Sequence, residues 1–195
     1  NLFTFGNPGL RPEYSRGWDA GIEKRLAEGR LLVDATFFRN DFRDLIVFNP
    51  NSSLGPFGAL ENVGTARSAG VELSARWLWS ADTSLTASYT FDDAIDSQSG
   101  TQLVRRPRDS FLVTLDHQLN QGTSAGLVLL HVGDRNDIAQ PLEGYYKLDL
   151  YLSWTLNDNW RMLARIDNML DEQYEEVFGY GTPGIGGFAG LTWTP

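Results

Sequence analysis

The feature that most constrains this chain is an alternation of apolar and polar residues that recurs from one end to the other. In its clearest segment, the even-numbered positions carry large apolar side chains: Tyr146, Leu148, Leu150, Leu152, Trp154 and Leu156. The positions between them are Lys147, Asp149, Tyr151, Ser153 and Thr155. Side chains of a strand point alternately to the two faces of its sheet, so the pattern predicts strands with one apolar and one polar face. Helical periodicity is hard to find, and we expect an all-β chain.

Turn-forming residues divide the chain into nine expected strands. Their ranges are about 15–27, 30–47, 58–79, 83–94, 109–119, 123–135, 145–156, 159–169 and 185–194. Tight turns at 27–29, 80–82, 120–122 and 157–158 alternate with long loops near 48–57, 95–108, 136–144 and 170–184. A transmembrane barrel explains this alternation, because its tight turns gather at the periplasmic rim and its long loops at the outer rim.

Aromatic residues near the ends of the expected strands also favour a membrane barrel. Tryptophans lie beside the tight turns and tyrosines beside the long loops, as two interfacial girdles would: Trp77, Trp79, Trp154 and Trp160, then Tyr145, Tyr146, Tyr174 and Tyr180. The strands suit a tilted span of about 9 to 11 residues, whereas no apolar stretch approaches the length of a transmembrane helix. We therefore expect an antiparallel up-and-down transmembrane β-barrel. The alternative is a soluble β-sandwich with an apolar core.

Nine strands are an odd number, and an antiparallel barrel closes only with an even one. Open edge strands would expose unpaired backbone groups to lipid at a cost of several kcal/mol each. The amino end has no initiating Met and no signal-like segment, and it resembles the interior of a longer protein. We therefore expect residues 1–195 to form an incomplete wall, the carboxy-terminal portion of a larger barrel whose other strands precede Asn1.

Composition excludes several classes of function. Asp and Glu number 25 against 16 Lys and Arg, so the net charge is −9 and no nucleic-acid partner is expected. The chain has no Cys, so it has no thiolate chemistry. It has only two His, and their positions indicate no Ser-His-Asp triad. The letters GxGxxG at 179–184 lack the helix that dinucleotide binding requires, and they predict a flexible loop. We expect no enzyme and no cofactor.

Several motifs follow one another in a recognisable order. They are Asn7-Pro8-Gly9-Leu10-Arg11-Pro12-Glu13-Tyr14-Ser15, Asn62-Val63-Gly64-Thr65-Ala66 with Gly70-Val71-Glu72, and Ile166-Asp167-Asn168-Met169-Leu170-Asp171-Glu172-Gln173-Tyr174. In this order and spacing the chain resembles the carboxy-terminal third of TonB-dependent outer-membrane receptors, in particular the cobalamin-receptor-like branch. It departs from the family pattern at Ile185, where Arg is usual, and at its end, where an aromatic residue is usual.

The resemblance implies a 22-stranded barrel in the outer membrane of a Gram-negative bacterium. Such a receptor binds a scarce small-molecule nutrient, a cobalamin or siderophore-type ligand, and imports it with energy from the TonB complex. The resemblance also implies that TonB acts through a plug domain absent from this chain, and that lipid of the outer membrane surrounds the wall. The rival function is a passive porin-like pore, and the presence of a plug domain upstream would decide between the two.

Candidate binding residues lie in the outer loops, where polar and aromatic side chains mix as in ligand pockets. They are Phe48, Asn49, Asn51, Phe57, Gln140 and Tyr145. Asp92, Asp93 and Asp96 offer oxygen ligands for calcium, but a solvated acidic loop is the favoured interpretation and no metal is expected.

Charged residues within the strands are spaced to point into the lumen: Asp19, Glu23, Asp34, Glu72, Arg16, Arg39, Arg76 and Arg165. We expect Leu148, Leu150, Leu152 and Trp154 to face lipid, because the opposite register would place a polar face in hydrocarbon.

Overall fold

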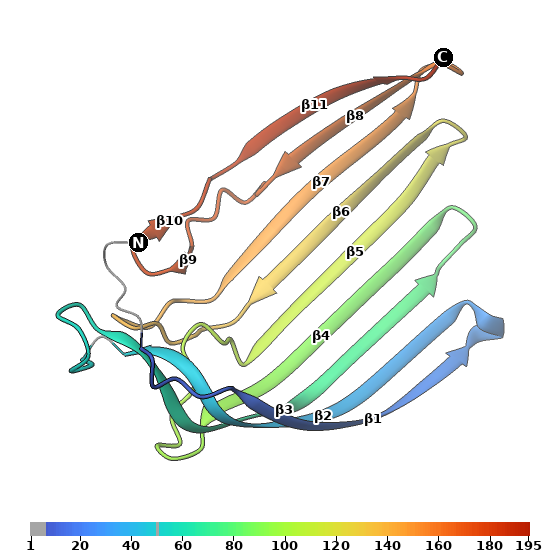
Figure 1. The fold of residues 1–195 in the computed structure, drawn as a ribbon. Helices are drawn as coiled ribbons and strands as arrows, with labels where there is room; N and C mark the ends of the chain where they lie inside the picture. The colour runs from blue at the N-terminus through green and yellow to red at the C-terminus, as the bar shows by residue number, and fades with distance from the viewer. Residues whose placement is uncertain (1–6, 50) are drawn as a thin grey trace.

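The computed structural model describes residues 7–49 and 51–195, and within them a nine-stranded antiparallel sheet dominates (Figure 1). The strands are β1 (Tyr14–Leu26), β2 (Leu31–Asn49), β3 (Ala59–Leu78), β4 (Thr83–Asp96), β5 (Asp109–Asn120), β6 (Thr123–Val132), β7 (Tyr145–Thr155), β8 (Trp160–Asp167) and β11 (Gly186–Trp193). Each strand pairs with its neighbour in the chain, and β8 pairs with β11. The expected all-β, up-and-down architecture is confirmed.

The connections fall at opposite ends of the sheet according to their length. Tight turns, including the 3-10 turn Ala27–Gly29, lie at one end, and the long loops lie at the other (Figure 1). No helix in the described ranges is long and apolar enough to cross a membrane. Two details differ from the sequence-based expectation. The strand expected at 123–135 ends at Val132, and the last long loop contains a small hairpin of β9 (Glu175–Val177) and β10 (Tyr180–Gly181).

Strand register separates the side chains into two faces, because directly paired residues of an antiparallel sheet lie on the same face. One row crosses seven strands with large apolar residues only: Leu31, Trp77, Leu85, Leu115, Leu127, Leu150 and Ile166. The neighbouring row on the other face carries Arg76, Thr86, Thr114, Val128 and Asp149. We call these the apolar face and the polar face of the sheet.

A glycine on the polar face allows two side chains to meet across a strand. Gly126 lies between Asp116 of β5 and Tyr151 of β7 in one register row. A Cβ atom at Gly126 would come within 2.2 Å of the Tyr151 ring. Because Gly126 has no side chain, the Tyr151 hydroxyl reaches over β6 and donates a hydrogen bond to Asp116.

The sheet has almost no protein core. Among the described residues the buried apolar side chains are Ala59, Ala66, Ala94, Leu142 and Tyr145. Leu148, Leu150 and Leu152 stay partly exposed on the apolar face, and Trp154 is 48% exposed. No second layer packs on these residues, so the apolar face requires an apolar environment outside the chain.

Arg16 and Arg39 lie on the apolar face, contrary to the lumenal placement expected from their spacing. Arg39 is eight residues beyond Leu31 in β2, so it shares the face of Leu31, and Arg16 shares that face because it pairs with Asp41. The physical reason is their height in the sheet. Both lie on the loop side of Phe37, where Arg39, Asp41 and Arg43 follow one another on this face of β2 and polar side chains no longer meet hydrocarbon.

We expect Leu150→Arg to destabilise the full-length protein by about 2–4 kcal/mol, because Leu150 lies midway along the apolar face of β7 and an Arg there would meet hydrocarbon. Val128→Arg is the matched control, because Val128 lies beside Asp149 on the polar face. Urea unfolding in lipid vesicles measures both variants. Equal losses of unfolding free energy would contradict the assignment of the two faces.

Candidate functional site

Three long loops meet at one carboxylate. Asp137, in the loop between β6 and β7, has a side chain that is 1% exposed. Its Oδ1 accepts hydrogen bonds from Arg105 Nε (2.9 Å) and from its neighbour, the Ile138 amide (2.7 Å). Its Oδ2 accepts one from the Phe178 amide (2.8 Å). Arg105 belongs to the loop after β4 and Phe178 to the loop after β8, so Asp137 ties three loops together. We call this contact the loop junction.

Aromatic stacking extends the loop junction towards the sheet. The rings of Tyr145 and Tyr174 stack with centroids 3.9 Å apart, and the Arg135 guanidinium lies 5.5 Å from the Tyr145 ring centroid. Arg135 is buried and also donates to the Glu175 carbonyl oxygen through Nη2. A buried guanidinium needs such partners, because an unpaired buried charge is costly. The loop after β8 is therefore fastened to the start of β7.

Hydrogen bonding determines the charge state of the loop junction. The Phe178 amide, followed by the Ile138 amide and Arg105, lowers the pKa of Asp137 below its ordinary value, although burial opposes this shift. A carboxylate with a lowered folded pKa stabilises the folded state above its unfolded pKa, and this stabilisation is lost as the pH falls through the folded pKa.

An open pocket of about 440 Å³ lies beside the loop junction, between the loop before β7 and the loop after β8. Its lining residues are Gln140, Pro141, Leu142, Glu143, Gly144, Glu172, Gln173, Tyr174, Glu175 and Gly181. The lining contains carboxylates and amides and neither Lys nor Arg. Such a pocket favours ligand groups that donate hydrogen bonds or carry positive charge. We call it the loop pocket.

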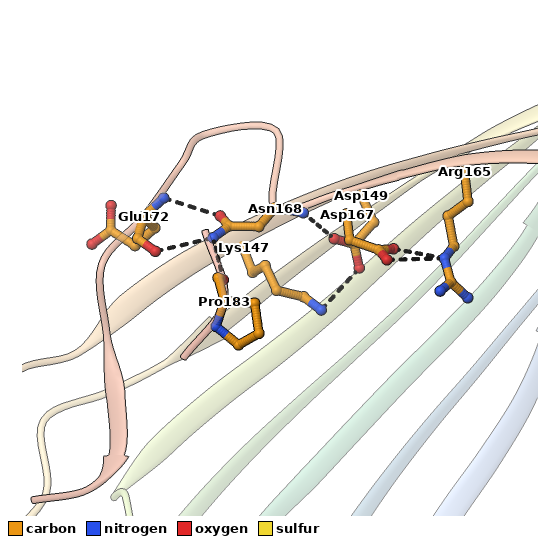
Figure 2. Close-up of polar contacts among 7 residues, drawn as sticks. All are labelled: Lys147, Asp149, Arg165, Asp167, Asn168, Glu172 and Pro183. Atoms are coloured by element: carbon orange, nitrogen blue, oxygen red, sulfur yellow. Dashed lines mark hydrogen bonds and ion pairs between the residues drawn. The ribbon is translucent and has the colours of Figure 1, made fainter. Parts of the chain in front are cut away.

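Asn168 follows the last residue of β8 and holds Glu172, which lines the loop pocket (Figure 2). Its backbone amide donates to Asp149 Oδ1 (2.8 Å), and its side chain bridges Glu172 and Pro183. Asn168 has φ of 52°, a left-handed conformation that Asn adopts more readily than most residues. At 2% exposure its amide has little access to water, and these hydrogen bonds satisfy it.

Ion pairs on the polar face accompany Asn168. Lys147 lies 3.1 Å from Asp149, and Arg165 lies 2.8 Å from Asp167, as Figure 2 shows. Because Asp149 contacts both Lys147 and the Asn168 amide, it connects the polar face of β7 to the start of the last long loop.

The predicted binding residues fall into two separate groups. Gln140 lines the loop pocket, and Tyr145 stacks on Tyr174 beside it. The other group is Phe48, Asn49, Asn51 and Phe57. Phe48 and Asn49 were expected in the loop, but β2 extends through both because they pair with Leu60 and Ala59 of β3. Asn51 and Phe57 lie in the loop between β2 and β3. Asn49 donates to Glu61 (2.9 Å) and accepts from the Asn51 amide (3.0 Å), and both Phe side chains are exposed. The structure does not bring the two groups into one pocket, and their role in ligand binding stays a prediction.

Asp92, Asp93 and Asp96, the weak calcium candidates, do not direct their carboxylates to one common site. Asp92 and Asp93 are consecutive in β4 and point to opposite faces, where Asp92 accepts from Ser68 and Asp93 pairs with two arginines. Asp96 accepts hydrogen bonds from the amides of the following loop, at Gln98 and Ser99. Within residues 7–49 and 51–195, no group of three or more His, Asp and Glu side chains could hold a metal ion.

Sequence reasoning missed Asp137 and Arg135, and it noticed Arg105 only as part of the family-like motif Arg105-Arg106-Pro107, without predicting its contact with Asp137. They lie in segments without periodicity, and their contacts join positions 32 to 41 residues apart. Asn168 did have a signal, because it belongs to the Ile166–Tyr174 motif, but the motif did not reveal what its side chain contacts.

Comparisons of the sequence with family models and of the fold with solved structures both lead to outer-membrane receptor barrels. A family model described as "TonB dependent receptor-like, beta-barrel" matches residues 1–169. Similar solved structures include the copper transporter OprC, with 20% identity and a TM-score of 0.78 over 94% of this chain. The ferric enterobactin receptor PfeA from Pseudomonas aeruginosa has 20% identity and a TM-score of 0.77 over 97% of the chain.

The ferric-catecholate import receptor Fiu from Escherichia coli K12 is also similar, with 20% identity and a TM-score of 0.74 over 96% of the chain. The chain corresponds to only 32% of OprC, 32% of PfeA and 29% of Fiu. At this level of identity the likeness shows the fold, and the fold is one part of a larger barrel wall.

We expect Asp137→Asn to loosen the loop junction in the full-length protein, because it removes the charge that Arg105 and two amides share. Spin labels at the exposed positions Val104 and Tyr180 report on the two loops that Asp137 joins. The distance distribution between the labels should broaden in Asp137→Asn. Asp134→Asn is the matched control, because Asp134 accepts a hydrogen bond from the Gly144 amide of its own loop (2.7 Å) and, within residues 7–49 and 51–195, has no ion pair with another loop.

The same labels test the direction of the pKa shift. In the parent the distribution should stay narrow above the ordinary Asp pKa of about 3.9 and broaden as the pH falls below it. In Asp137→Asn it should be broad at every pH. A parent distribution that does not change between neutral and acid pH would contradict a structural role for the Asp137 charge.

Proposed function

Because the chain belongs to the TonB-dependent receptor β-barrel family, we propose that the complete protein imports a scarce small nutrient across the outer membrane with energy from the TonB complex. Members of this family are outer-membrane proteins of Gram-negative bacteria, and they are transporters rather than enzymes. The family match over residues 1–169 is the observation that carries the proposal. In this function the described sheet supplies part of the barrel wall and four outer loops.

The loop pocket is the proposed contact between this part of the wall and the nutrient. It lies at the long-loop end of the sheet, and its carboxylates and amides favour a ligand with exposed N–H or ammonium groups. The loop junction supports this role, because loops held in one arrangement lose less conformational entropy when a ligand binds. The end of β2 and the loop that follows it, with Phe48, Asn49, Asn51 and Phe57, are a second proposed contact.

The nutrient itself has two proposed classes. The motifs resemble the cobalamin-receptor-like branch, whereas the similar structures named above are a copper transporter and two receptors of ferric complexes. The assignment to the cobalamin branch therefore rests on the motifs alone. We propose a cobalamin or siderophore-type ligand, and in either class the ligand is a complexed metal too large for simple diffusion.

Energy dependence separates a gated receptor from a passive pore. Uptake of radiolabelled cobalamin and of a panel of ferric siderophores is measured in cells that express the complete protein, with and without TonB. A receptor should accumulate one ligand only when TonB is present. Equal uptake in both strains would indicate a pore and would overturn the proposal.

We expect shortening of loop 48–57 or loop 136–144 to weaken binding of the imported ligand to whole cells, because both loops lie outside the strand ladder at the outer rim. Asn157→Ala is the control at the opposite rim. Asn157 Oδ1 accepts hydrogen bonds from the Asn159 and Trp160 amides in a tight turn, so its loss should lower assembly and leave affinity per folded molecule unchanged. Parent-like binding by both shortened variants would place recognition elsewhere in the receptor.

A further inference from the structure

A band of arginines crosses the apolar face at its long-loop end. It consists of Arg16, Arg39, Arg43, Arg67 and Arg108, interspersed with Asp41 and Asp93. Register places Arg16, Asp41 and Arg67 in one row, and Arg39 and Asp93 in the next. Arg108 is placed there by its ion pair with Asp93. Asp109 lies on the same face, paired with Phe91 directly below the row of Arg39 and Asp93. Five cations against these three anions still form a positive surface on a chain whose net charge is −9. We call this surface the arginine band.

Aromatic residues immediately below the arginine band mark its height in the membrane. Tyr89, Phe111, His131 and Tyr146 form one register row across β4 to β7. Such aromatic rows lie at the boundary between hydrocarbon and headgroups. The band lies on the loop side of this row and of Phe37 and Phe91, so it is at headgroup level. Long loops mark the outer rim, which places the band in the outer leaflet.

The arginines retain donors that the protein does not use. Arg39 pairs with Asp41 (2.9 Å), while Arg67 and Arg108 share the single carboxylate of Asp93 (3.6 and 3.2 Å). Arg16 and Arg43 are exposed and form no ion pair within the described residues. Each guanidinium has five N–H donors in a planar fork that matches two oxygens of a phosphate. The band therefore has both excess charge and free donors for phosphate groups.

An apolar groove of about 370 Å³ lies on the same face, nearer the middle of the sheet, and one register row with Val71, Phe91 and Asp109 separates it from the arginine band. Its lining on the apolar face is Leu73, Ala75, Ala87, Tyr89, Phe111 and Val113. Ala75 and Ala87 pair directly, so two small side chains form the floor between larger neighbours. Tyr89, at the upper end of the groove, is four residues from Asp93 in β4, or about 13 Å along the strand.

We propose that the arginine band and the groove together bind one phosphorylated lipid of the outer leaflet. The guanidiniums of Arg39, Arg67 and Arg108 contact its phosphate, and one acyl chain lies along the groove. Charge complementarity selects this occupant, because a neutral lipid would leave the excess positive charge without a counterion. The site is on the opposite face of the sheet from Asp149 and Asn168, and it is independent of nutrient binding.

The test uses the full-length receptor, purified in a neutral detergent, and two probes. One probe is a phosphorylated diglucosamine lipid, and the other is the same lipid with its phosphates removed. Native mass spectrometry measures how much of each lipid the folded receptor retains. We expect the parent to bind the phosphorylated lipid about tenfold more tightly, as loss of hydrogen bonds to a charged group predicts.

The triple variant Arg39→Gln, Arg67→Gln, Arg108→Gln should bind both lipids equally. The control triple variant, Arg25→Gln, Arg76→Gln, Arg161→Gln, removes the same charge from the polar face and should keep the parent preference. Ala87→Phe fills the groove floor. It should weaken binding of both lipids, and the receptor should still bind the phosphorylated lipid more tightly than the dephosphorylated one. Only receptor that shows the heat-dependent gel shift of a folded barrel is compared, so a folding defect cannot imitate loss of the site.

Three results would overturn the proposal. The first is a parent-like lipid preference in the Arg39, Arg67, Arg108 variant. The second is equal retention of the two lipids by the parent, which would mean that the phosphate is not recognised. The third is displacement of the lipid by millimolar inorganic phosphate, which would indicate a site for the free ion.

Discussion

Hydrocarbon cannot hydrogen-bond to a peptide group, and most of this structure follows from that constraint. Every backbone donor and acceptor between β1 and β11 must find its partner in an adjacent strand, because an unpaired group in lipid costs several kcal/mol. The continuous antiparallel ladder meets this requirement across the sheet. It also explains why so few side chains are buried by protein: the apolar face is matched to lipid, so cohesion comes from the ladder and the membrane instead of an internal core.

Residues under a periodic constraint could be predicted from the sequence, and the others could not. Leu148, Leu150 and Leu152 were assigned to their face because a shift of one position would bury polar side chains in lipid. Arg16 and Arg39 were misassigned because alternation carries no information on where the hydrocarbon ends. No sequence pattern indicated the role of Asp137, because its partners Arg105 and Phe178 lie on loops without periodicity, 32 and 41 residues away in the chain. Its importance depends on loops that meet only after the strands have aligned.

The motifs identify the family better than they identify the nutrient, and Asn168 shows why. Its side chain holds the backbone of the last long loop at Glu172 and Pro183, so the motif around it specifies how the wall ends. The loop pocket is lined instead by residues such as Gln140 and Glu143, which support no strand and can vary without cost to the ladder. The motif around Asn168 therefore specifies how the wall ends and not which ligand the loops bind.

The order of the strands has a consequence for how such a wall forms. From β1 to β8 each strand pairs with the strand that follows it in the chain, and the long loop that carries the β9–β10 hairpin separates β8 from β11. Each new ladder thus closes a single turn or loop, for which the entropy cost grows only slowly with length, and needs no distant segment to be in place. The sheet can lengthen by one strand at a time, each completed strand serving as the template for the next.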